Sequence, residues 1–355
     1  MASPTTASGA DAPRPGSGRP EPGRTGGVLV TGGAGYIGSH AAKALRLDGR
    51  RVVIYDNLGE GHREAALGAE LVVADTQDVA RLRAVMAERK VGAVMHFAAW
   101  TAVGESVRDP AGYYRNNVLG TLSVLEAMAL EGVGRFIFSS TAAVFGEPEQ
   151  VPITEAHATR PINAYGETKL TIERALPHFE RAYGIRSVSL RYFNAAGADP
   201  DGELGEDHHP ERHVIPLALL AATGGEPLQV FGTDYPTPDG TCLRDYIHVT
   251  DLAQAHVLAL AALEGGAPST VYNLGNGRPH SVREVLDTVG RVTGRAVPHS
   301  LGPRRPGDPA VLYASSDRIK ADLGWTPRFE ELETIIDTAW RWRRSHPRGF
   351  GSTAG

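Results

Sequence analysis

A glycine-rich turn early in the chain constrains the fold more than any other sequence feature. It follows Val28-Leu29-Val30, a short apolar run, and precedes the Ala- and Leu-rich segment 39–47. Its glycines are spaced three apart, at Gly32, Gly35 and Gly38. Glycine permits a tight turn and a close backbone approach to a pyrophosphate, and a helix that starts there offers unpaired N–H groups to an anion. The pattern predicts a strand, a turn and a helix that bind a dinucleotide. The turn alone could also serve only to pack the helix on the strand.

An acidic residue after the next strand favours the dinucleotide interpretation. Residues 51–55 form a second apolar run, and Asp56 ends it 18 residues after Gly38. A carboxylate in this place can accept hydrogen bonds from an adenosine ribose, and it repels a 2′-phosphate. The sequence therefore predicts NAD rather than NADP as the cofactor.

Apolar strands and helices then alternate as far as residue 194. We expect further strands at 71–74, 93–97, 135–138 and 187–192, and helices at 79–89, 117–129 and 165–183. Continuously apolar strands separated by helices are typical of a parallel sheet that is covered on both faces. The predicted fold class is α/β, a doubly wound parallel sheet of the Rossmann type.

The regular alternation of strands and helices ends after residue 194. We expect the rest of the chain to form a smaller α/β lobe that binds the substrate. We expect short strands at 228–231 and 271–274, and helices at 214–222, 250–263, 281–293 and 330–344. The predicted organisation is a disordered tail at 1–27, the NAD-binding domain at 28–194, the second lobe at 195–345 and a frayed tail at 346–355. Segments of the two lobes can interleave.

Composition excludes several classes of function. The formal net charge is −5, from 36 basic and 41 acidic side chains, which disfavours nucleic-acid binding. The single cysteine, Cys242, rules out an internal disulfide and a Cys-based metal site, and suits a reducing cytoplasm. No apolar stretch is long enough to span a membrane, and residues 1–27 lack the apolar core of a signal peptide.

A tyrosine and a lysine begin the predicted helix at 165–183. Tyr165 and Lys169 are four residues apart, so they lie on one helical face. An ammonium beside a phenol favours the phenolate and lowers the tyrosine pKa, which would make Tyr165 a general base. Ser139-Ser140-Thr141 ends the fifth strand, where a doubly wound sheet opens toward its ligand. Those hydroxyls could bond a sugar or could simply form a turn.

Five motifs, in order along the chain, resemble those of the UDP-galactose 4-epimerases (UDP-glucose 4-epimerases), within the extended short-chain dehydrogenase/reductase family. They lie at 32–38, 55–58, 96–106, 165–169 and 239–249. The last, Asp-Gly-Thr-Cys-Leu-Arg-Asp-Tyr-Ile-His-Val, is the most diagnostic because it lies outside the general dehydrogenase signature. The resemblance covers residues 28–342.

The resemblance implies a role for each matching residue. Tyr165 is the base on the sugar 4-hydroxyl, Lys169 tunes it, and Thr141 bridges it to the substrate. NAD would contact Gly32, Gly35, Tyr36, Ile37, Gly38, Asp56, Asn57, Asp75, Phe97, Ala98, Ala99, Asn116, Tyr165, Lys169 and Tyr192. The UDP-sugar would contact Thr141, Tyr165, Asn194, His213, Val214, Phe231, Arg244, Arg305, Asp308 and Leu312.

Within the substrate set, Arg244 and Arg305 would bind the diphosphate, and Asp308 the uridine ribose. Leu312 would border the sugar 2-position. The implied reaction inverts carbon 4 of a UDP-hexose through a 4-keto intermediate, in a cytoplasmic homodimer. One departure is Thr101, where some members of the family have a lysine that touches the adenosine ribose.

Three other functions stay open at this point. A sugar-nucleotide 4,6-dehydratase carries an acidic pair after the catalytic threonine, and a UDP-glucuronate decarboxylase or epimerase usually carries a glutamate in that stretch, whereas Ala142-Ala143 stand here. A non-catalytic NAD-binding protein would typically lose the tyrosine or the lysine. The pair His208-His209 could indicate a metal site, but we expect a solvated loop there and no metal.

Overall fold

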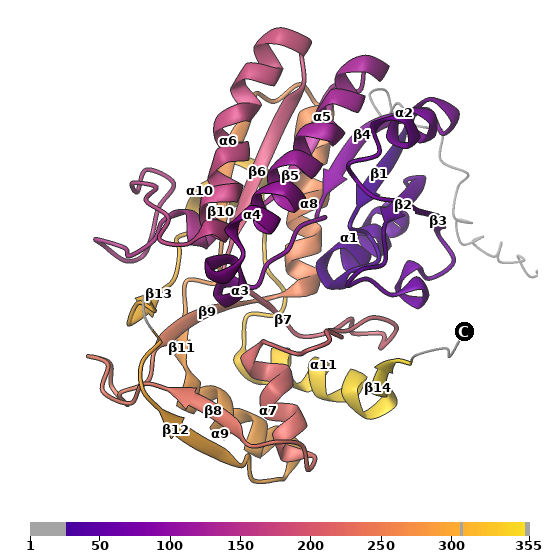
Figure 1. Ribbon diagram of the computed structural model, residues 1–355. Helices are drawn as coiled ribbons and strands as arrows, with labels where there is room; N and C mark the ends of the chain where they lie inside the picture. Colours follow the sequence, from indigo (N-terminus) through magenta and orange to yellow (C-terminus); the bar gives the residue numbers. More distant parts are fainter. Residues whose placement is uncertain (1–25, 306–307, 352–355) are drawn as a thin grey trace, which may run out of the picture.

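A seven-stranded parallel sheet forms the centre of the computed structural model, which describes residues 26–305 and 308–351 (Figure 1). The strand order is β10-β6-β5-β4-β1-β2-β3, and the order reverses at β1. This confirms the doubly wound α/β fold, whose ligand crevice lies beyond the carboxyl ends of the strands. The strands are β1 (Gly27–Thr31), β2 (Val52–Asp56), β3 (Glu70–Val73), β4 (Val91–His96), β5 (Arg135–Thr141), β6 (Arg186–Tyr192) and β10 (Thr270–Leu274).

Side chains of these strands alternate between two cores. Val28 and Val30 pack with helices α1 (Tyr36–Leu47) and α8 (Val249–Glu264) on one face. Leu29 packs with α2 (Val79–Glu88), α5 (Gly120–Glu131) and α6 (Ala164–Tyr183) on the other. Because apolar side chains point to both faces, each strand reads as a continuous apolar run.

A smaller lobe lies below the large sheet in Figure 1. Strand β9 (Leu243–His248) is its centre, and it pairs with β7 (Asn194–Ala196), β11 (Pro279–Ser281) and β13 (Val311–Leu312). Strands β8 (Leu228–Phe231) and β12 (His299–Gly302) form a separate pair. Helices α7 (Val214–Ala222), α9 (Val282–Thr293) and α11 (Leu332–Ser345) share a core with them.

Short elements complete the described chain. They are the helices α3 (Val103–Arg108), α4 (Pro110–Tyr113) and α10 (Asp317–Leu323), the 3₁₀ turns η1 (Arg63–Ala66) and η3 (Ala142–Val144), the π-helical segment η2 (Tyr114–Leu119) and strand β14 (Pro347–Phe350). The predicted helix at 117–129 in fact begins as η2 and becomes α-helical only at Gly120.

The two lobes interleave along the chain. Helix α8 and strand β10 fall within the segment 195–345, yet α8 packs on α1 and β10 pairs with β6 at the edge of the large sheet. Figure 1 shows α8, drawn in orange, within the upper layer. Residues 249–274 therefore complete the first lobe rather than the second.

The C-terminal segment differs from its prediction. Residues 346–355 were expected to fray, but Pro347–Phe350 is extended and the Phe350 N–H donates to a carboxylate oxygen of Asp207 at 2.9 Å. The Phe350 ring also packs 5.1 Å from His62, between ring centroids. That expectation is wrong for residues 346–351, because a backbone hydrogen bond and ring contacts anchor them. Residues 352–355 and most of the expected N-terminal tail, 1–25, lie outside the described residues.

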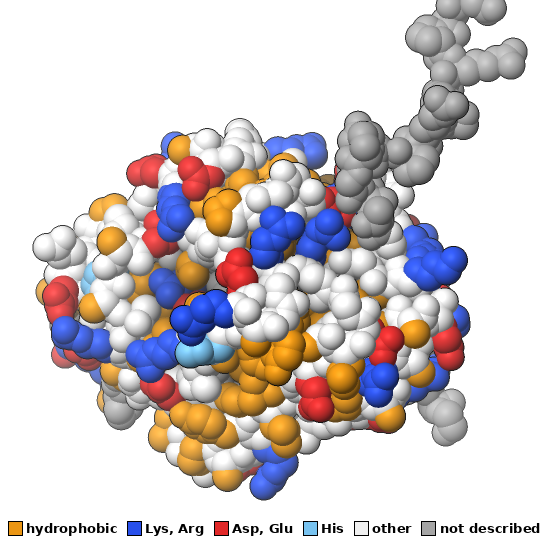
Figure 2. Space-filling view, turned by 90° about the horizontal axis from the view of Figure 1, so that it is seen from above, with side chains coloured by type: hydrophobic (Ala, Val, Ile, Leu, Met, Phe, Trp, Pro, Cys, Tyr) orange, Lys and Arg blue, Asp and Glu red, His pale blue; other side chains and the backbone are white. Residues whose placement is uncertain are grey.

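The surface carries charges of both signs. On the face in Figure 2, Lys and Arg side chains are interspersed with Asp and Glu. Such a mixture offers no continuous basic track on that face for a nucleic-acid backbone. Among residues 26–305 and 308–351, no helix has the length and apolar character needed to cross a membrane.

Candidate active site

The three glycines of the turn have different surroundings, so a side chain at each would meet different atoms. Gly32 has φ +71°, and a Cβ there would lie 2.4 Å from the Ala98 nitrogen. A Cβ on Gly38 would lie 2.1 Å from the Gly32 oxygen, so α1 can pack on the turn only without a side chain. A Cβ on Gly35 would meet only the Gly32 oxygen, at an ordinary 3.4 Å. The protein's own packing therefore explains Gly32 and Gly38, whereas Gly35 leaves open space beside the backbone.

The start of α1 faces that space. Gly35 is its N-cap, and no side chain caps the helix within the described chain. The Tyr36 hydroxyl donates to the Gly197 carbonyl at 2.7 Å, and Ile37 packs on the core, so both side chains are structural. Only their backbone N–H groups can face an anion. An uncapped helix start beside an open glycine fits a pyrophosphate.

Asp56 joins the turn to β2. Its carboxylate accepts hydrogen bonds from the backbone nitrogens of Ala34, at 3.0 Å, and Leu58, at 2.8 Å. Burial raises the pKa of Asp56, and the same two N–H groups oppose the shift. Next to it, the Asn57 amide donates to the Asp75 carboxylate at 3.0 Å, and both side chains are exposed. These three residues, all assigned to NAD from sequence, do gather at one edge of the turn.

The loop after β4 forms the opposite wall of this crevice. Ala98 donates its N–H to the Thr31 carbonyl at 3.1 Å, which places Phe97, Ala98 and Ala99 beside the glycine turn. Asn117, in the π-helical segment η2, fixes this loop. It accepts from the Trp100 nitrogen at 2.8 Å and donates to the Trp100 carbonyl at 3.0 Å.

Asn117 also links this loop to helix α6. Its amide donates to the Thr168 hydroxyl of α6 at 3.2 Å, and it accepts from Asn116 at 2.9 Å. From sequence, only Asn116 of this Asn-Asn pair was assigned to the cofactor, and the structural hydrogen bonds of Asn117 were not predicted.

Thr141 and Tyr165 meet where β5 ends and α6 begins. The Asn163 side chain caps α6 by accepting from the Gly166 nitrogen at 2.8 Å. A Cβ on Gly166 would lie 2.4 Å from the Ala143 oxygen, so only glycine lets α6 start this close to the loop after β5. A hydrogen bond between Thr141 and the half-buried Tyr165 follows from this approach. Neither Asn163 nor Gly166 was singled out from sequence, although Asn three residues before Gly166 is a typical N-cap position.

Lys169 is buried one turn further into α6. Its ammonium donates to the Ser139 carbonyl at 2.9 Å and lies 5.0 Å from the centre of the Phe138 ring. Burial lowers the pKa of Lys169 to about 7, and the charge of Glu173 acts in the opposite direction. The Ser139 hydroxyl is hydrogen-bonded in turn to the Tyr192 hydroxyl.

Tyr165 in the chain alone does not have the lowered pKa that its spacing from Lys169 suggested. Burial raises the pKa of Tyr165, and the hydrogen bond with Thr141 only opposes that rise. The Lys169 ammonium is hydrogen-bonded to a backbone carbonyl, so its positive charge stabilises the Tyr165 phenolate less than the spacing of the two residues suggested. Activation of the phenol therefore needs a further positive charge, and an oxidised nicotinamide carries one.

A buried ion pair fixes the part of α6 that follows Lys169. Glu173, one turn after Lys169, accepts from the Arg191 guanidinium at 3.0 and 2.5 Å and from the Ser140 hydroxyl at 2.5 Å. A two-pronged Arg–carboxylate contact fixes both side chains. It ties α6 to β5 and β6, and sequence analysis missed it because the three residues lie far apart in the chain.

Strand β9 connects the segments that follow β6 and β10 to the second lobe. Asn194 of β7 donates to the Asp245 carbonyl at 3.0 Å. The fully buried Asp245 carboxylate accepts from the backbone nitrogens of Asn276 at 2.9 Å and Gly277 at 3.2 Å. Its pKa rises to about 6 because burial outweighs these N–H groups. Asp245, unassigned from sequence, holds three segments together.

The residues assigned to UDP gather around this strand. Arg244 forms an ion pair with Asp308, and the Arg305 guanidinium lies 3.8 Å from the centre of the Phe231 ring. Leu312 pairs with Arg244 across β13 and β9 and packs in the small core of the loop after Thr141. The structure thus brings the predicted phosphate and ribose contacts together.

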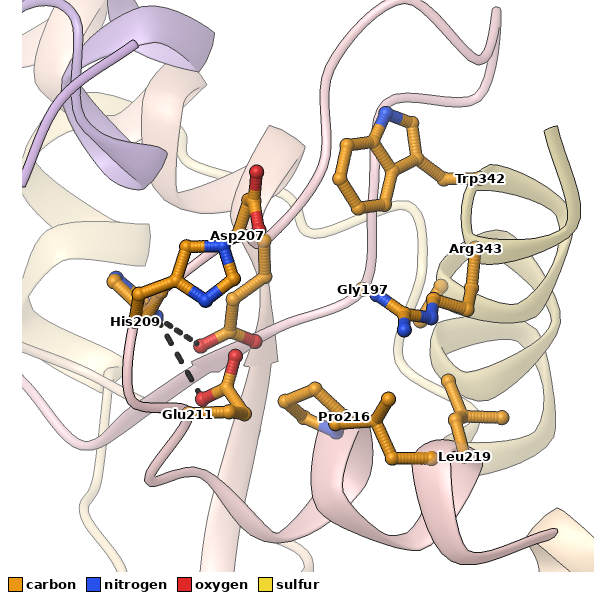
Figure 3. A pocket seen from close by; sticks show the side chains of 12 residues that line it. Gly197, Asp207, His209, Glu211, Pro216, Leu219, Trp342 and Arg343 are labelled. Carbon is orange, nitrogen blue, oxygen red and sulfur yellow. Dashed lines mark ion pairs between the residues drawn. The ribbon is translucent and has the colours of Figure 1, made fainter. Parts of the chain in front are cut away.

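His213 and Val214 begin α7 at the end of the long loop after β7. Val214 packs in the second-lobe core, and His213 is half exposed. His209 is 80% exposed, as a solvated loop requires, but His208 is only 19% exposed and lies between two carboxylates. The prediction of a solvated loop is therefore wrong for His208. Figure 3 shows the pocket beside it.

Lys169 gives a pH-dependent prediction for the cofactor-free protein. Its folded-state pKa of about 7 lies below the ordinary lysine value of 10.5, so its contribution to stability is present above pH 10.5 and is lost as pH falls through 7. Methionine carries no ionisable group, so Lys169→Met does not lose stability in this way when the pH falls. We expect the variant to be more stable than the wild type by a few kcal/mol below about pH 7, at about 1.4 kcal/mol per pKa unit, with the difference shrinking toward about pH 10. Urea unfolding across this range measures it, and a difference independent of pH would contradict the assignment.

Comparisons with known proteins agree with this geometry. The model of the "NAD dependent epimerase/dehydratase family" matches residues 28–275. The chain belongs to this family. It is 48% identical over 326 residues to the UDP-glucose 4-epimerase of Lacticaseibacillus casei, covering 91% of this chain and 98% of that protein.

Solved structures of the epimerase family are also similar to this chain. The UDP-glucose 4-epimerase of Brucella ovis in complex with NAD is 52% identical, with a TM-score of 0.87, over 89% of this chain and 97% of that one. The UDP-Glc/GlcNAc 4-epimerase of Campylobacter jejuni is 37% identical, with a TM-score of 0.79, over 90% and 99%. The cofactor crevice described above lies within the part of the chain that the family model matches.

Proposed function

We propose that this chain is an NAD-dependent epimerase that inverts carbon 4 of UDP-glucose and UDP-galactose through a 4-keto sugar. One observation carries the proposal. The Thr141–Tyr165 pair, with Lys169 behind it, stands at the carboxyl end of the sheet, in the same crevice as the uncapped start of α1. The relatives that carry the name UDP-glucose 4-epimerase support it over nearly the whole length of both chains.

In this proposal each catalytic residue acts on a defined atom. The Tyr165 oxygen takes the proton of the sugar 4-hydroxyl and later returns one to the keto oxygen. The Thr141 hydroxyl bonds both that oxygen and the substrate, and Lys169 holds the nicotinamide ribose. When bound, NAD supplies hydride acceptance and return at carbon 4.

We propose that the protein holds the substrate mainly through its uridine diphosphate. Arg244 and Arg305 present guanidinium forks, which match phosphate oxygens. Asp308 would then exchange its contact with Arg244 for the uridine ribose, and Phe231 would exchange Arg305 for the base. A sugar held mainly through its diphosphate can turn over within the pocket, so that hydride returns to its other face.

A dehydratase is disfavoured by the loop after Thr141. Ala142 and Ala143 occupy the positions where an acid would have to expel the sugar 6-hydroxyl, and Ala142 is buried. The hydroxyl of Thr141 accepts from the Ala143 nitrogen at 3.1 Å, which orients it within this loop. The loop therefore offers hydrogen bonds but no carboxyl group at these two positions.

A direct assay tests the proposed function. The purified chain should convert UDP-galactose into UDP-glucose, read by a coupled UDP-glucose dehydrogenase reaction. On denaturation it should release NAD rather than NADP, because the Asp56 carboxylate repels a 2′-phosphate. The absence of conversion with NAD bound would favour a non-catalytic role. Release of NADP would overturn the assignment of Asp56.

Leu312 predicts the choice of sugar. An acetamido group at the sugar 2-position is larger than a hydroxyl, so a rigid leucine wall should cost about 1–3 kcal/mol by overpacking. We expect a preference of roughly 5- to 150-fold for UDP-galactose over UDP-N-acetylglucosamine. Leu312→Cys should reduce it. Catalytic efficiencies for both sugars in both proteins measure this, and Leu301→Cys, on an exposed strand of the second lobe, is the matched control.

We further propose a cytoplasmic homodimer and two interleaved lobes. Leu119, at the end of η2, and Leu130, in the adjoining α5, are 48% and 56% exposed, which gives a second copy an apolar contact. The single, buried Cys242 suits a reducing compartment. Sedimentation of the full chain tests the dimer.

A further inference from the structure

The long loop between β7 and α7 gathers two histidines and two glutamates. The loop spans residues 197–213 without a helix or strand of its own. One ligand atom each from Glu206, His208, Glu211 and His213 lies within 4.8 Å of the others. We call these four residues the β7–α7 cluster. We propose that the β7–α7 cluster binds one Zn²⁺ ion.

The spacing of the ligand atoms fits a tetrahedral zinc site. Zinc binds imidazole nitrogen and carboxylate oxygen at about 2.0–2.2 Å, so neighbouring ligand atoms in a tetrahedron lie about 3.3–3.6 Å apart. The His208 Nδ1 lies 3.4 Å from a Glu206 oxygen and 3.7 Å from a Glu211 oxygen. The His213 Nδ1 also lies 3.7 Å from that Glu211 oxygen.

One edge of the tetrahedron is too short in the chain alone. The His213 Nδ1 and the Glu206 carboxylate are in direct hydrogen-bond contact. Zinc would replace the proton of that contact and move the two atoms apart. The other three distances given above need shifts of only a few tenths of an ångström at most.

His208 provides an independent indication. Its Nδ1 is buried and has no hydrogen bond of acceptable geometry with any described residue, although it is directed at two carboxylates. A buried ring nitrogen without a partner is costly, and a metal ion would satisfy it. Dashed lines in Figure 3 mark ion pairs at this cluster.

The charges of the β7–α7 cluster also match a divalent cation. The side chains of Glu206 and Glu211 are only 7% and 9% exposed, so they bring two negative charges into a partly dry site. Zinc bound by these two carboxylates and two neutral imidazoles would leave a net charge of zero.

Backbone groups already hold one ligand in place. The Glu211 carboxylate accepts from the backbone nitrogens of Arg212, at 2.7 Å, and His213, at 3.0 Å. Contacts of this kind orient metal ligands. On the other side, the Tyr36 ring of α1 meets the His208 ring edge-on at 6.2 Å between centroids. The ion would therefore fix the loop, and the His213 N-cap of α7, against the first lobe.

A second acidic group in the described chain lacks these features. Asp199, Asp201 and Glu203 also lie close together, but the Lys43 ammonium sits among them at 2.7, 2.9 and 2.7 Å. A cation from the chain itself already neutralises that group. The β7–α7 cluster has no lysine or arginine ion-paired to it within the described residues, since the Arg212 guanidinium contacts Glu60 and Glu105 instead.

Zinc binding to the untagged full-length protein tests the proposal. After removal of metal with EDTA, Zn²⁺ is titrated in competition with a chromophoric chelator. We expect one Zn²⁺ per chain. Loss of an outer-shell partner of a metal ligand typically costs 10–100-fold in affinity, so His208→Ala, which removes a ligand, should cost at least about 100-fold. His209→Ala, which changes the exposed neighbour, should bind as the wild type does.

Two further measurements separate binding from folding and from chance contacts. Co²⁺ in place of Zn²⁺ should give the strong visible absorption of a four-coordinate site in the wild type and in His209→Ala, and lose it in His208→Ala. Circular dichroism checks that the variant is folded. If His208→Ala is unfolded, Glu206→Gln takes its place. No binding by the wild type, or equal binding by all variants, would overturn the site and leave an ion-pair network or adventitious surface binding only.

Discussion

Tyr165→Phe is expected to lower the turnover of UDP-galactose by about 10²–10⁴-fold, because the change removes the oxygen that the proposed mechanism assigns to taking the 4-hydroxyl proton. The ring stays, so its packing against the loop after β5 should persist. The protein should fold and retain NAD as the wild type does. The measurement is turnover at saturating UDP-galactose, together with the amount of NAD released on denaturation.

Tyr183→Phe is the matched control for this experiment. Tyr183 lies at the other end of the same helix, is 60% exposed, and loses the same hydroxyl group. We expect its turnover to be unchanged. Turnover of Tyr165→Phe near that of the wild type would remove Tyr165 from the mechanism, and loss of NAD from this variant would indicate a structural role instead.

Gly35→Ala is expected to weaken NAD binding while the protein stays folded. The new Cβ meets only the Gly32 oxygen, at 3.4 Å, and the backbone of Gly35 (φ −82°, ψ 176°) suits alanine. A methyl group in the space beside the pyrophosphate should cost about 1–3 kcal/mol, which is roughly 5- to 150-fold in NAD affinity. Titration of the NAD-stripped protein measures this affinity.

Two other glycines make the result specific. Gly38→Ala would push a Cβ to 2.1 Å from the Gly32 oxygen, so it should lower the free energy of unfolding itself. Gly290→Ala in α9, where the nearest atom is 3.6 Å away, should leave NAD affinity unchanged and should not lower the free energy of unfolding, because alanine favours a helix interior over glycine by about 0.5–1 kcal/mol. Unaltered NAD affinity in Gly35→Ala would show that the open space beside Gly35 is not the pyrophosphate site.

Local sequence patterns predicted most of the large sheet because each strand and helix carries its own signal. The apolar runs around Val28 and Ile54 lie in strands, and Ser281 was correctly placed at the start of a helix, where it forms a capping box with Glu284. Strand β9 was not predicted, although it lies within the most diagnostic motif. Its Arg244 and Asp245 interrupt the apolar pattern, and their burial depends on partners far along the chain.

The parts of the site that sequence did not predict depend on contacts between distant segments. The Lys169 ammonium could not be assigned to the Ser139 carbonyl without the packing of α6 on β5, and so the direction of the Tyr165 pKa shift was misjudged. The hydrogen bonds between the Asn117 side chain and the Trp100 backbone also join distant segments, so they could not be predicted from the sequence either. Glycine spacing is the exception, because Gly32 and Gly38 contact residues of the turn and the loop beside it.

The position of β10 has a consequence for synthesis of the chain on the ribosome. Strand β6 ends at Tyr192, and its outer neighbour β10 is complete only at Leu274, about 82 residues later. At about 5–20 residues per second, roughly 4–16 s separate the two strands. During that interval β6 is an open edge strand, and the face of α1 that α8 covers is exposed. The nascent first lobe is therefore open to aggregation until much of the second lobe has been translated.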